Sequence, residues 1–278
     1  MSNIYVVATP IGNLDDMSPR AIETLKRVDL IAAEDTRHSG RLLQHFAIDT
    51  PATSLHEHNE RDKANRLLER VKGGESLALI SDAGTPLISD PGFHLLREAR
   101  KQGVTIVPIP GACALITALS AAGLPTDKFI FEGFLPAKSG ARLARLQDLA
   151  TETRTIIFYE STHRIHDCLT DCMTCFGETR VAVLAKELTK HFETIIDGSL
   201  VELKTWLEAE AERQKGEFVI LIKGFEKDDD RIAPEALRIL DLLAQELPLK
   251  KAAKLTADIT GEKKNRLYDV GLGREKMG

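Results

Sequence analysis

Short apolar runs, rich in β-branched residues, alternate with longer amphipathic stretches through the first part of the chain. The runs predict strands at Ile4–Ala8, Asp29–Ala33, Leu77–Ile80 and Val104–Val107. The amphipathic stretches predict a helix opened by Ser18-Pro19 and further helices at Glu60–Lys72, Gly92–Gln102 and Ala112–Ala122. Alternation of strands and helices predicts an α/β fold with a largely parallel, doubly wound sheet.

A second α/β region follows the linker-like sequence Leu124-Pro125-Thr126-Asp127, with more strands per helix. Strands are expected at Phe129–Glu132, Thr155–Tyr159, Val181–Leu184, Glu193–Ile196 and Phe218–Ile222. Helices are expected at Arg142–Leu149, His163–Phe176 and Leu200–Gln214. The crowding of strands near the end favours a mixed sheet. We therefore expect an N-terminal domain at residues 1–124 and a C-terminal mixed α/β domain at residues 125–225.

A charged segment, Glu226–Asp230, precedes a helical tail at residues 231–278. Two helices, Leu249–Ile259 and Glu262–Tyr268, flank Gly261, which is the outline of a helix-turn-helix. Residues 248–278 carry eight Lys/Arg and four Asp/Glu, a net charge of +4, and the remaining 247 residues carry −9. The overall charge of −5 alone argues against a polyanionic partner, but a basic tail on an acidic body restores that possibility.

The composition, 43% apolar and 28% charged, is ordinary for a globular protein and excludes a disordered chain. The uncharged stretch Gly103–Thr126 has the length of a membrane span, but Pro108, Pro110 and Gly111 interrupt it. The N-terminus lacks the features of a signal peptide. Four cysteines are too few for a disulfide scaffold. These features predict a cytoplasmic protein with reduced thiols and no membrane segment.

The loop Ser81–Gly92 is the strongest candidate for ligand binding, because ligands of open α/β sheets bind at the carboxyl ends of strands. Asp82 can accept hydrogen bonds, and Gly84 and Thr85 are small enough to let a ligand approach the backbone. Asp90 is expected only to cap the next helix. The first turn, Thr9–Leu14, lacks G-x-G-x-x-G, and no Walker A sequence occurs, which disfavours dinucleotide-binding and NTPase functions.

The spacing of Cys168, Cys172 and Cys175 matches that of iron–sulfur radical enzymes. The same spacing places three residues on one face of a helix that Ser161 can cap and Gly177 can end. Core packing is therefore the preferred interpretation. The polar clusters Glu34–His38 and His56–Asn59 lack a further ligand at a recognisable spacing, so no metal is expected.

Two further loops follow strands, at Phe158–Arg164 and Ala185–Lys190. In the first, Glu160 either caps the following helix or reaches a site. In the second, Lys186 and Glu187 either form a surface ion pair or reach a site. Several such loops facing one cleft favour a shared site.

Motifs in a fixed order now identify a resemblance. They are Thr9–Leu14, Ala33–Arg37, Ser81–Pro86, Glu132–Pro136, Phe158–Ser161, Lys186–Lys190, Lys215–Glu217 and Lys263–Asn265. Together they closely resemble the bacterial 16S rRNA (cytidine-2′-O)-methyltransferases of the tetrapyrrole methylase superfamily, over nearly the whole chain. The resemblance implies two α/β domains with S-adenosylmethionine in the cleft between them, a homodimer, and a cytidine in the decoding region of 16S rRNA as substrate.

The resemblance also implies which residues contact the cofactor: Pro10, Asp82, Gly84, Thr85, Cys113, Ala114, Tyr159 and Ala185. A ribose 2′-hydroxyl is a poor nucleophile, so a general base should assist its attack. Glu160, Lys186 and Glu187 are the candidates, and the sequence does not choose among them. Arg37, Arg164 and four lysines of the tail, Lys250, Lys251, Lys263 and Lys264, are the expected RNA contacts.

Three other functions remain as alternatives. A tetrapyrrole C-methyltransferase of the precorrin type shares the fold and the cofactor but has no need of a basic tail. A non-enzymatic RNA-binding module explains the tail but not the loops at the strand ends. A radical enzyme explains the three cysteines only.

Overall fold

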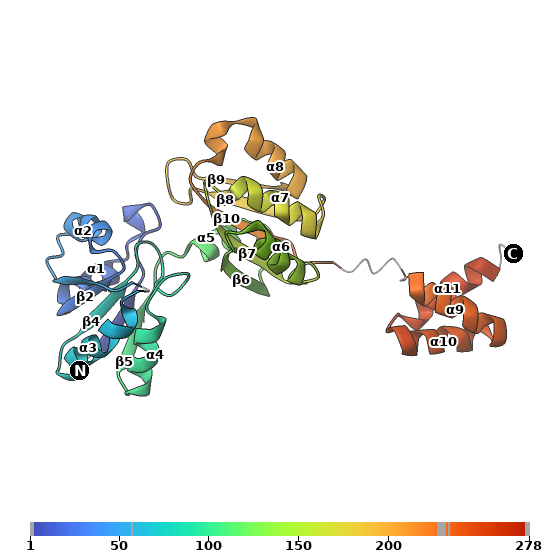
Figure 1. The fold of residues 1–278 in the computed structure, drawn as a ribbon, viewed down its shortest axis with the longest axis horizontal. Helices are drawn as coiled ribbons and strands as arrows, with labels where there is room; N and C mark the ends of the chain where they lie inside the picture. The colour runs from blue at the N-terminus through green and yellow to red at the C-terminus, as the bar shows by residue number, and fades with distance from the viewer. Residues whose placement is uncertain (1–2, 57, 227–231, 233, 276–278) are drawn as a thin grey trace. The chain divides into compact units, whose positions relative to one another are not determined.

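The computed structural model describes residues 3–56, 58–226, 232 and 234–275. The chain divides into two compact units, of which unit 1 ends at Phe225 and unit 2 begins at Glu226. Unit 1 contains two five-stranded sheets, and unit 2 is helical (Figure 1). The division of unit 1 into two domains at residue 124 stays a prediction.

The first sheet has the strand order β3-β2-β4-β1-β5, and all its strands are parallel. Its strands are β1 (Asn3–Val7), β2 (Leu30–Ala33), β3 (Ala52–Ser54), β4 (Leu77–Ile80) and β5 (Thr105–Ile109). Every residue of β2 and β4 is buried, as in strands covered on both faces. The predicted doubly wound, parallel sheet is confirmed.

Helices cover both faces of this sheet (Figure 1). They are α1 (Pro19–Arg27), α2 (Thr36–His45), α3 (Glu60–Lys72) and α4 (Phe93–Lys101), with a short 3₁₀ helix η1 (Leu14–Asp16). Leu25 of α1 and Leu43 of α2 join the core on one face, while Leu68 of α3 and Leu95 of α4 join the core on the other. Ser18 caps α1 as predicted, since its side chain accepts a hydrogen bond from the Ala21 amide.

Two adjacent strands of this sheet, β1 and the central β4, lead to helices on opposite faces. The chain leaves β1 for α1 on one face and leaves β4 for α4 on the other. Adjacent strands whose connections diverge in this way open a crevice at their carboxyl ends, where open α/β sheets bind ligands. The crevice therefore lies between the loops Thr9–Leu14 and Ser81–Gly92.

The second sheet is mixed, as predicted, with the order β6-β7-β10-β8-β9. Its strands are β6 (Phe129–Phe134), β7 (Thr155–Ser161), β8 (Val181–Lys186), β9 (Thr194–Ser199) and β10 (Glu217–Ile222). The pair β6 and β7 is parallel, and every other neighbouring pair is antiparallel.

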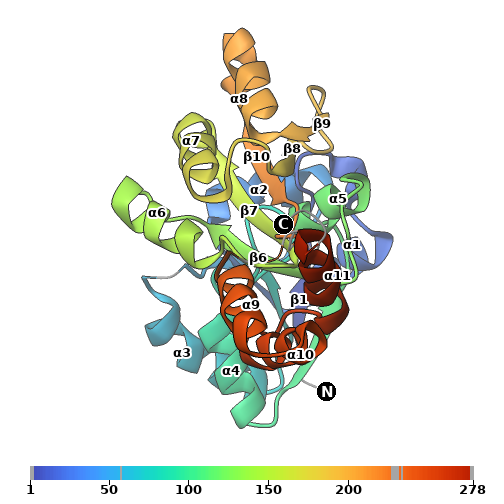
Figure 2. The same ribbon diagram turned by 90° about the vertical axis from the view of Figure 1, so that its right-hand side faces the viewer.

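Side chains of the second sheet alternate between two apolar layers. Phe158, Leu184 and Ile220 face the core made with α6 (Ser139–Asp148), α7 (Ile165–Phe176) and α8 (Leu200–Ala209). Residues one position along, such as Val183 and Val219, face α5 (Ala114–Ala121) instead. Figure 2 shows α6 and α7 on one side of the sheet and α5 on the other. Because α5 precedes the second sheet in the chain, a helix from the first half covers a sheet of the second half.

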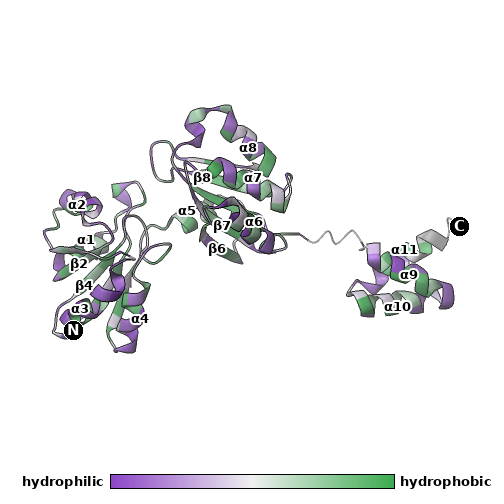
Figure 3. Cartoon of the chain, viewed as in Figure 1, coloured by the Kyte–Doolittle hydropathy of each residue, from purple (hydrophilic) through white to green (hydrophobic). Residues whose placement is uncertain are grey.

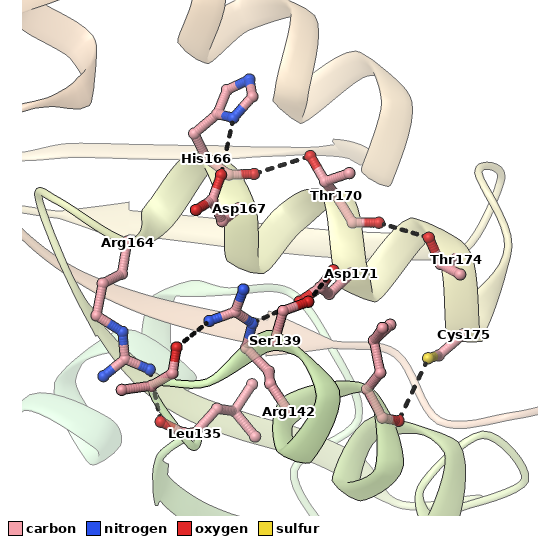
Figure 4. A network of polar contacts seen from close by, with 12 residues as sticks. Leu135, Ser139, Arg142, Arg164, His166, Asp167, Thr170, Asp171, Thr174 and Cys175 are labelled. Atoms are coloured by element: carbon pink, nitrogen blue, oxygen red, sulfur yellow. Dashed lines mark hydrogen bonds and ion pairs between the residues drawn. The ribbon is translucent and has the colours of Figure 1, made fainter.

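The three cysteines lie on α7, and Cys168 and Cys172 are fully buried in the core of the second sheet. A hydrogen bond to Cys168 and burial raise the pKa of the Cys172 thiol. The Cys175 thiol lies 3.6 Å from the carbonyl oxygen of Leu143 on α6 (Figure 4). The cysteines therefore serve core packing, as predicted. Among the described residues, no three His, Cys, Asp or Glu side chains are grouped as metal ligands.

Unit 2 consists of α9 (Pro234–Glu246), α10 (Leu249–Thr260) and α11 (Lys264–Glu275). Leu240, Ala252, Ala253 and Leu267 bring the three helices together around a small core. Gly261 ends α10 with a φ of 77°, which is the turn predicted between two tail helices. Figure 3 shows the hydrophobic residues of these helices interleaved with hydrophilic ones, as in amphipathic helices. Within the residues that the structure covers, no helix is long and apolar enough to span a membrane.

Several local predictions were wrong. The segment around Glu34–His38 continues into α2, and β3 forms a fifth strand that the sequence did not reveal. Asp90 does not cap α4, because Gly92 occupies the N-cap and no side chain bonds there. Ser161 does not cap α7, since it ends β7 and Arg164 occupies the N-cap.

Candidate functional site

A cavity of about 340 Å³, the first cavity, opens at the carboxyl ends of the strands of unit 1. Its walls come from loops of the first sheet, from the start of α5 and from β7, β8 and β10 of the second sheet. Residues that line the cavity include Ile11, Glu34, Asp82, Gly84, Thr85, Asp90, Cys113, Ala114, Phe134, Tyr159, Glu160, Ala185 and Val219.

Backbone contacts hold two of these loops together at the switch point. The Thr9 amide donates to the Gly84 carbonyl oxygen at 2.8 Å, and the Gly84 amide donates to the Thr9 carbonyl oxygen at 3.1 Å. Gly84 has a φ of +81°, and a Cβ there would lie 3.2 Å from the Ile11 side chain. The Thr85 hydroxyl donates to the Ala112 carbonyl oxygen at 3.0 Å, which attaches the segment before α5. Three loops are thereby fixed around one opening.

Three carboxylates, those of Glu34, Asp82 and Asp90, line the first cavity on the side of the first sheet. Asp82 Oδ1 accepts the Asp35 amide at 3.1 Å. Burial, together with the charges of Glu34 and Asp82, raises the pKa of Asp90 to about 6 against the lowering effect of a hydrogen bond with Ser81. Mutual repulsion of partly buried carboxylates is relieved by a cation, so this wall suits a positively charged ligand.

Aromatic side chains form the opposite wall. The Tyr159 hydroxyl accepts a hydrogen bond from the Leu115 amide at 3.0 Å, which joins β7 to α5. Burial raises the pKa of Tyr159 above its usual range. Phe131 and Phe134 contact the Tyr159 ring edge to face, with ring centroids 4.8 and 5.7 Å away. Phe134 is 54% exposed, so it offers an aromatic surface at the mouth of the cavity.

Strand pleating decides which predicted residues reach the cavity. Tyr159 and Ala185 lie on the face of the sheet toward α5 and line the cavity. Lys186, one position along β8, points to the opposite face, where its ammonium donates to the Glu212 carbonyl oxygen at 3.1 Å. Glu187 bonds Lys190 at 2.9 Å. Lys186 and Glu187 line neither of the cavities described and do not pair with each other.

Glu160 is the one base candidate whose residue lines the first cavity. It is 2% exposed, and its Oε1 accepts the Ser161 amide at 2.8 Å. Its Oε2 has no hydrogen-bond partner and lies 3.3 Å from the Arg164 guanidinium. Glu160 therefore does not cap α7. Its side chain lies on the same face of the sheet as that of Lys186, away from Tyr159, because both residues pair with Phe218 of β10, and its carboxylate is enclosed beside Arg164.

Seven of the eight predicted cofactor contacts line the first cavity: Asp82, Gly84, Thr85, Cys113, Ala114, Tyr159 and Ala185. Pro10 lines a second, neighbouring cavity instead. Sequence reasoning missed Glu34, Asp90 and Phe134 as lining residues. Asp90 lay in the loop that the sequence singled out, but its resemblance to a helix cap concealed its position.

The predicted RNA contacts differ in exposure. Arg37 has a side chain that is 90% exposed and pairs with Asp35 at 2.8 Å. Arg164 is more enclosed, because it donates to the Leu135 carbonyl oxygen at 2.5 Å (Figure 4). It also lies 3.3 Å from Glu160. In unit 2, four exposed residues are named here the tail lysines: Lys250, Lys251, Lys263 and Lys264.

The profile of the tetrapyrrole (corrin/porphyrin) methylases matches residues 3–204. The chain belongs to this family. A second profile, the RsmI C-terminal HTH domain, matches residues 230–275, which correspond to unit 2. The family that the sequence motifs predicted is thereby confirmed.

Curated relatives agree over almost the full length. A protein of Pseudomonas aeruginosa is 58% identical over 98% of this chain and 97% of its own length. A protein of Escherichia coli O157:H7 is 54% identical over 98% of this chain and 95% of its own length. Both are named "Ribosomal RNA small subunit methyltransferase I".

Solved structures of the family share the fold. A cobalt precorrin-4 methyltransferase aligns with a TM-score of 0.57 and 16% identity, over 80% of this chain and 95% of its own. A diphthine synthase aligns with a TM-score of 0.61 and 15% identity, over 80% of this chain and 90% of its own. At these identities the likeness concerns architecture alone, and it confirms the predicted fold class.

Proposed function

We propose that this chain methylates the 2′-hydroxyl of a cytidine in the decoding region of 16S rRNA, with S-adenosylmethionine as the methyl donor. The observation that carries the proposal is the full-length match to ribosomal RNA small subunit methyltransferases, which includes the C-terminal domain as well as the methylase fold. A methylase acting on a small tetrapyrrole has no need of a separate helical unit bearing exposed lysines.

The first cavity fits the proposed cofactor in size and charge. A volume of about 340 Å³ lies within the range of small-molecule sites. S-adenosylmethionine supplies a methyl group already activated on a cationic sulfonium. Asp82 and Asp90 would stabilise positive charge, Gly84 and Ala114 would allow close approach to the backbone, and Tyr159 would provide an apolar wall.

Glu160 is proposed as the general base. It is the one candidate whose residue lines the cavity, and its Oε2 has no hydrogen-bond partner, so it would accept the proton of the ribose hydroxyl once its side chain turns from Arg164 toward the cavity. Its carboxylate lies 3.3 Å from the Arg164 guanidinium, so this turn would exchange an ion pair for the contact with the hydroxyl. Holding the hydroxyl in line with the methyl group is the larger part of the task, since positioning contributes roughly 7–11 kcal/mol in favourable cases.

RNA binding is proposed to involve Arg37 and the tail lysines. These cations are exposed, and phosphate contacts by such side chains supply affinity that falls with salt. The family resemblance supports a homodimer, and the four free cysteines fit a reducing, cytoplasmic compartment.

The test is transfer of a labelled methyl group to small ribosomal subunits from cells that lack this modification. Label should appear at one cytidine ribose, and Glu160→Gln should abolish the transfer while cofactor binding persists. Subunits already carrying the methyl group are the control. Absence of label in RNA, with cofactor binding shown by calorimetry, would refute the proposal, and label in a tetrapyrrole offered in parallel would favour C-methylation.

A further inference from the structure

A second cavity of about 310 Å³ adjoins the first, with which it shares Ile11, Asp82, Ala83 and Glu217. Its remaining walls are the first turn, α2 and Lys190. Given the proposed function, we propose that this cavity holds the ribose phosphate of the target nucleotide, with Ser39 and Arg41 of α2 binding its phosphate.

The first observation concerns Ser39, because no group of the protein forms a hydrogen bond with its buried hydroxyl. The residue is 2% exposed, lines the second cavity, and its Oγ has no hydrogen-bond partner. Buried hydroxyls in proteins are nearly always hydrogen-bonded. A ligand oxygen in the cavity would satisfy this hydroxyl, which therefore indicates that the cavity takes a polar ligand.

The positive charge of Arg41 on α2 indicates that the part of the ligand near this helix is an anion. Arg41 lines the cavity there, and it has no ion-pair partner among the described residues. His38, three residues earlier on the same helix, lines the cavity too. A guanidinium presents a planar fork of donors that matches a phosphate, and the Ser39 hydroxyl, which belongs to a residue lining the same cavity from another side of α2, would be a further donor.

The carboxylates of the cavity lie elsewhere and suit the sugar. Glu217 shares the Lys190 ammonium with Glu187, at 2.8 and 2.9 Å, so its charge is compensated only in part. Asp82 belongs to the wall common to both cavities. Carboxylates accept hydrogen bonds from ribose hydroxyls, so a ribose at that wall would have its hydroxyls beside the first cavity while its phosphate lies toward α2.

The first turn packs closely against Lys190 at this cavity. Gly12 has a φ of +154°, and a Cβ there would lie 2.5 Å from the Lys190 side chain. Lys190 is held on its other side by Glu187 and Glu217, at 2.9 and 2.8 Å. Lys190 is therefore packed on one side and paired on the other, as a side chain that orients a sugar requires.

The experiment measures kcat and KM for unmethylated small subunits, cofactor affinity by calorimetry, and thermal stability for Arg41→Ala and Ser39→Ala. Arg66→Ala is the matched control, since Arg66 is exposed on α3 and lines neither cavity. Arg41→Ala should raise KM about tenfold, by loss of one phosphate contact, and Ser39→Ala about threefold. The melting temperature of Ser39→Ala should stay level or rise, because an unpartnered hydroxyl is removed.

Each of the other outcomes contradicts either the phosphate site in the second cavity or the proposed function on which it rests. A fall in cofactor affinity that accompanies the rise in KM in both variants would assign the second cavity to the cofactor. Wild-type KM in both variants, with active wild-type enzyme, would overturn the inference and leave the proposed function intact. A wild-type enzyme that does not methylate the subunits would refute the proposed function itself.

Discussion

Replacing Arg142 by methionine should destabilise unit 1 by removing one member of a buried ion pair. Arg142 Nε lies 2.6 Å from Asp171 Oδ2, and the two side chains are 4% and 12% exposed. Arg142 also donates to the Ala137 carbonyl oxygen at 3.2 Å, which ties the loop after β6 to α6 (Figure 4). That loop follows Phe134, which lines the first cavity.

The expected loss of stability follows from the Asp171 carboxylate, which stays buried when Arg142 is removed. Breaking a buried pair by removing one partner costs about 3–5 kcal/mol, because the other charge stays buried. Asp171 still accepts a hydrogen bond from the Ser139 hydroxyl at 3.2 Å. The lower end of this range is therefore expected, a fall of about 3 kcal/mol in the free energy of unfolding. For a unit of this size that corresponds to a fall in Tm of roughly 6–12 °C.

Thermal and urea denaturation followed by circular dichroism measure this change. The matched control is Arg145→Met, whose arginine is 44% exposed and pairs with Glu132, so about 1 kcal/mol or less is expected. Replacing Asp171 by leucine in the Arg142→Met background should recover part of the loss. Equal effects of Arg142→Met and Arg145→Met, or a double variant no more stable than the single one, would refute the reasoning.

Three further predictions concern ligand binding and catalysis. Lowering the pH through about 6 protonates Asp90, whose pKa is raised by burial, so affinity for the cationic cofactor should fall on the acid side and level off above this pH. Calorimetry with Asp90→Asn should show a flatter profile. Glu160→Gln should lower kcat about 100-fold or more and leave the cofactor Kd unchanged. Replacing the tail lysines by alanine should reduce the slope of log affinity against log salt by about 3 in RNA-binding titrations.

Each of these predictions has a contrary outcome. Cofactor affinity independent of pH between about 5 and 7 in the wild type would exclude a role for the Asp90 charge. Retention of kcat in Glu160→Gln would remove Glu160 as the base. An unchanged salt slope after loss of the tail lysines would show that unit 2 does not contact the phosphate backbone.

The period of the hydrophobic pattern and the length of each patterned segment made most of the fold predictable. Strands such as Leu77–Ile80 and helices such as Glu60–Lys72 agree with the structure because each carries a strong local pattern. The strand β3 has three residues at a sheet edge, too few to show a period. The helix α2 has only Leu43 and Ser39 buried, so its apolar stripe is too narrow to predict it.

The site was predictable only in part, since a cavity is a property of tertiary packing. The loop containing Asp82, Gly84 and Thr85 was found because strand ends of open sheets bind ligands. The opposite orientations of Ala185 and Lys186 follow from the pleat of β8, a signal in the sequence that was not used. Asp90 was assigned to a helix cap because Asp-Pro before a helix is a common local signal, and only the packing of three loops shows otherwise.

The position of α5 bears on how this protein is made. During synthesis, α5 leaves the ribosome before any strand of the sheet that it covers, so Leu115 and Leu119 stay without their partners until β10 has been translated. Until then the growing chain carries an uncovered apolar helix, a candidate for chaperone binding. For the same reason, fragments cut after residue 124 should aggregate when expressed alone and regain solubility when the two are expressed together.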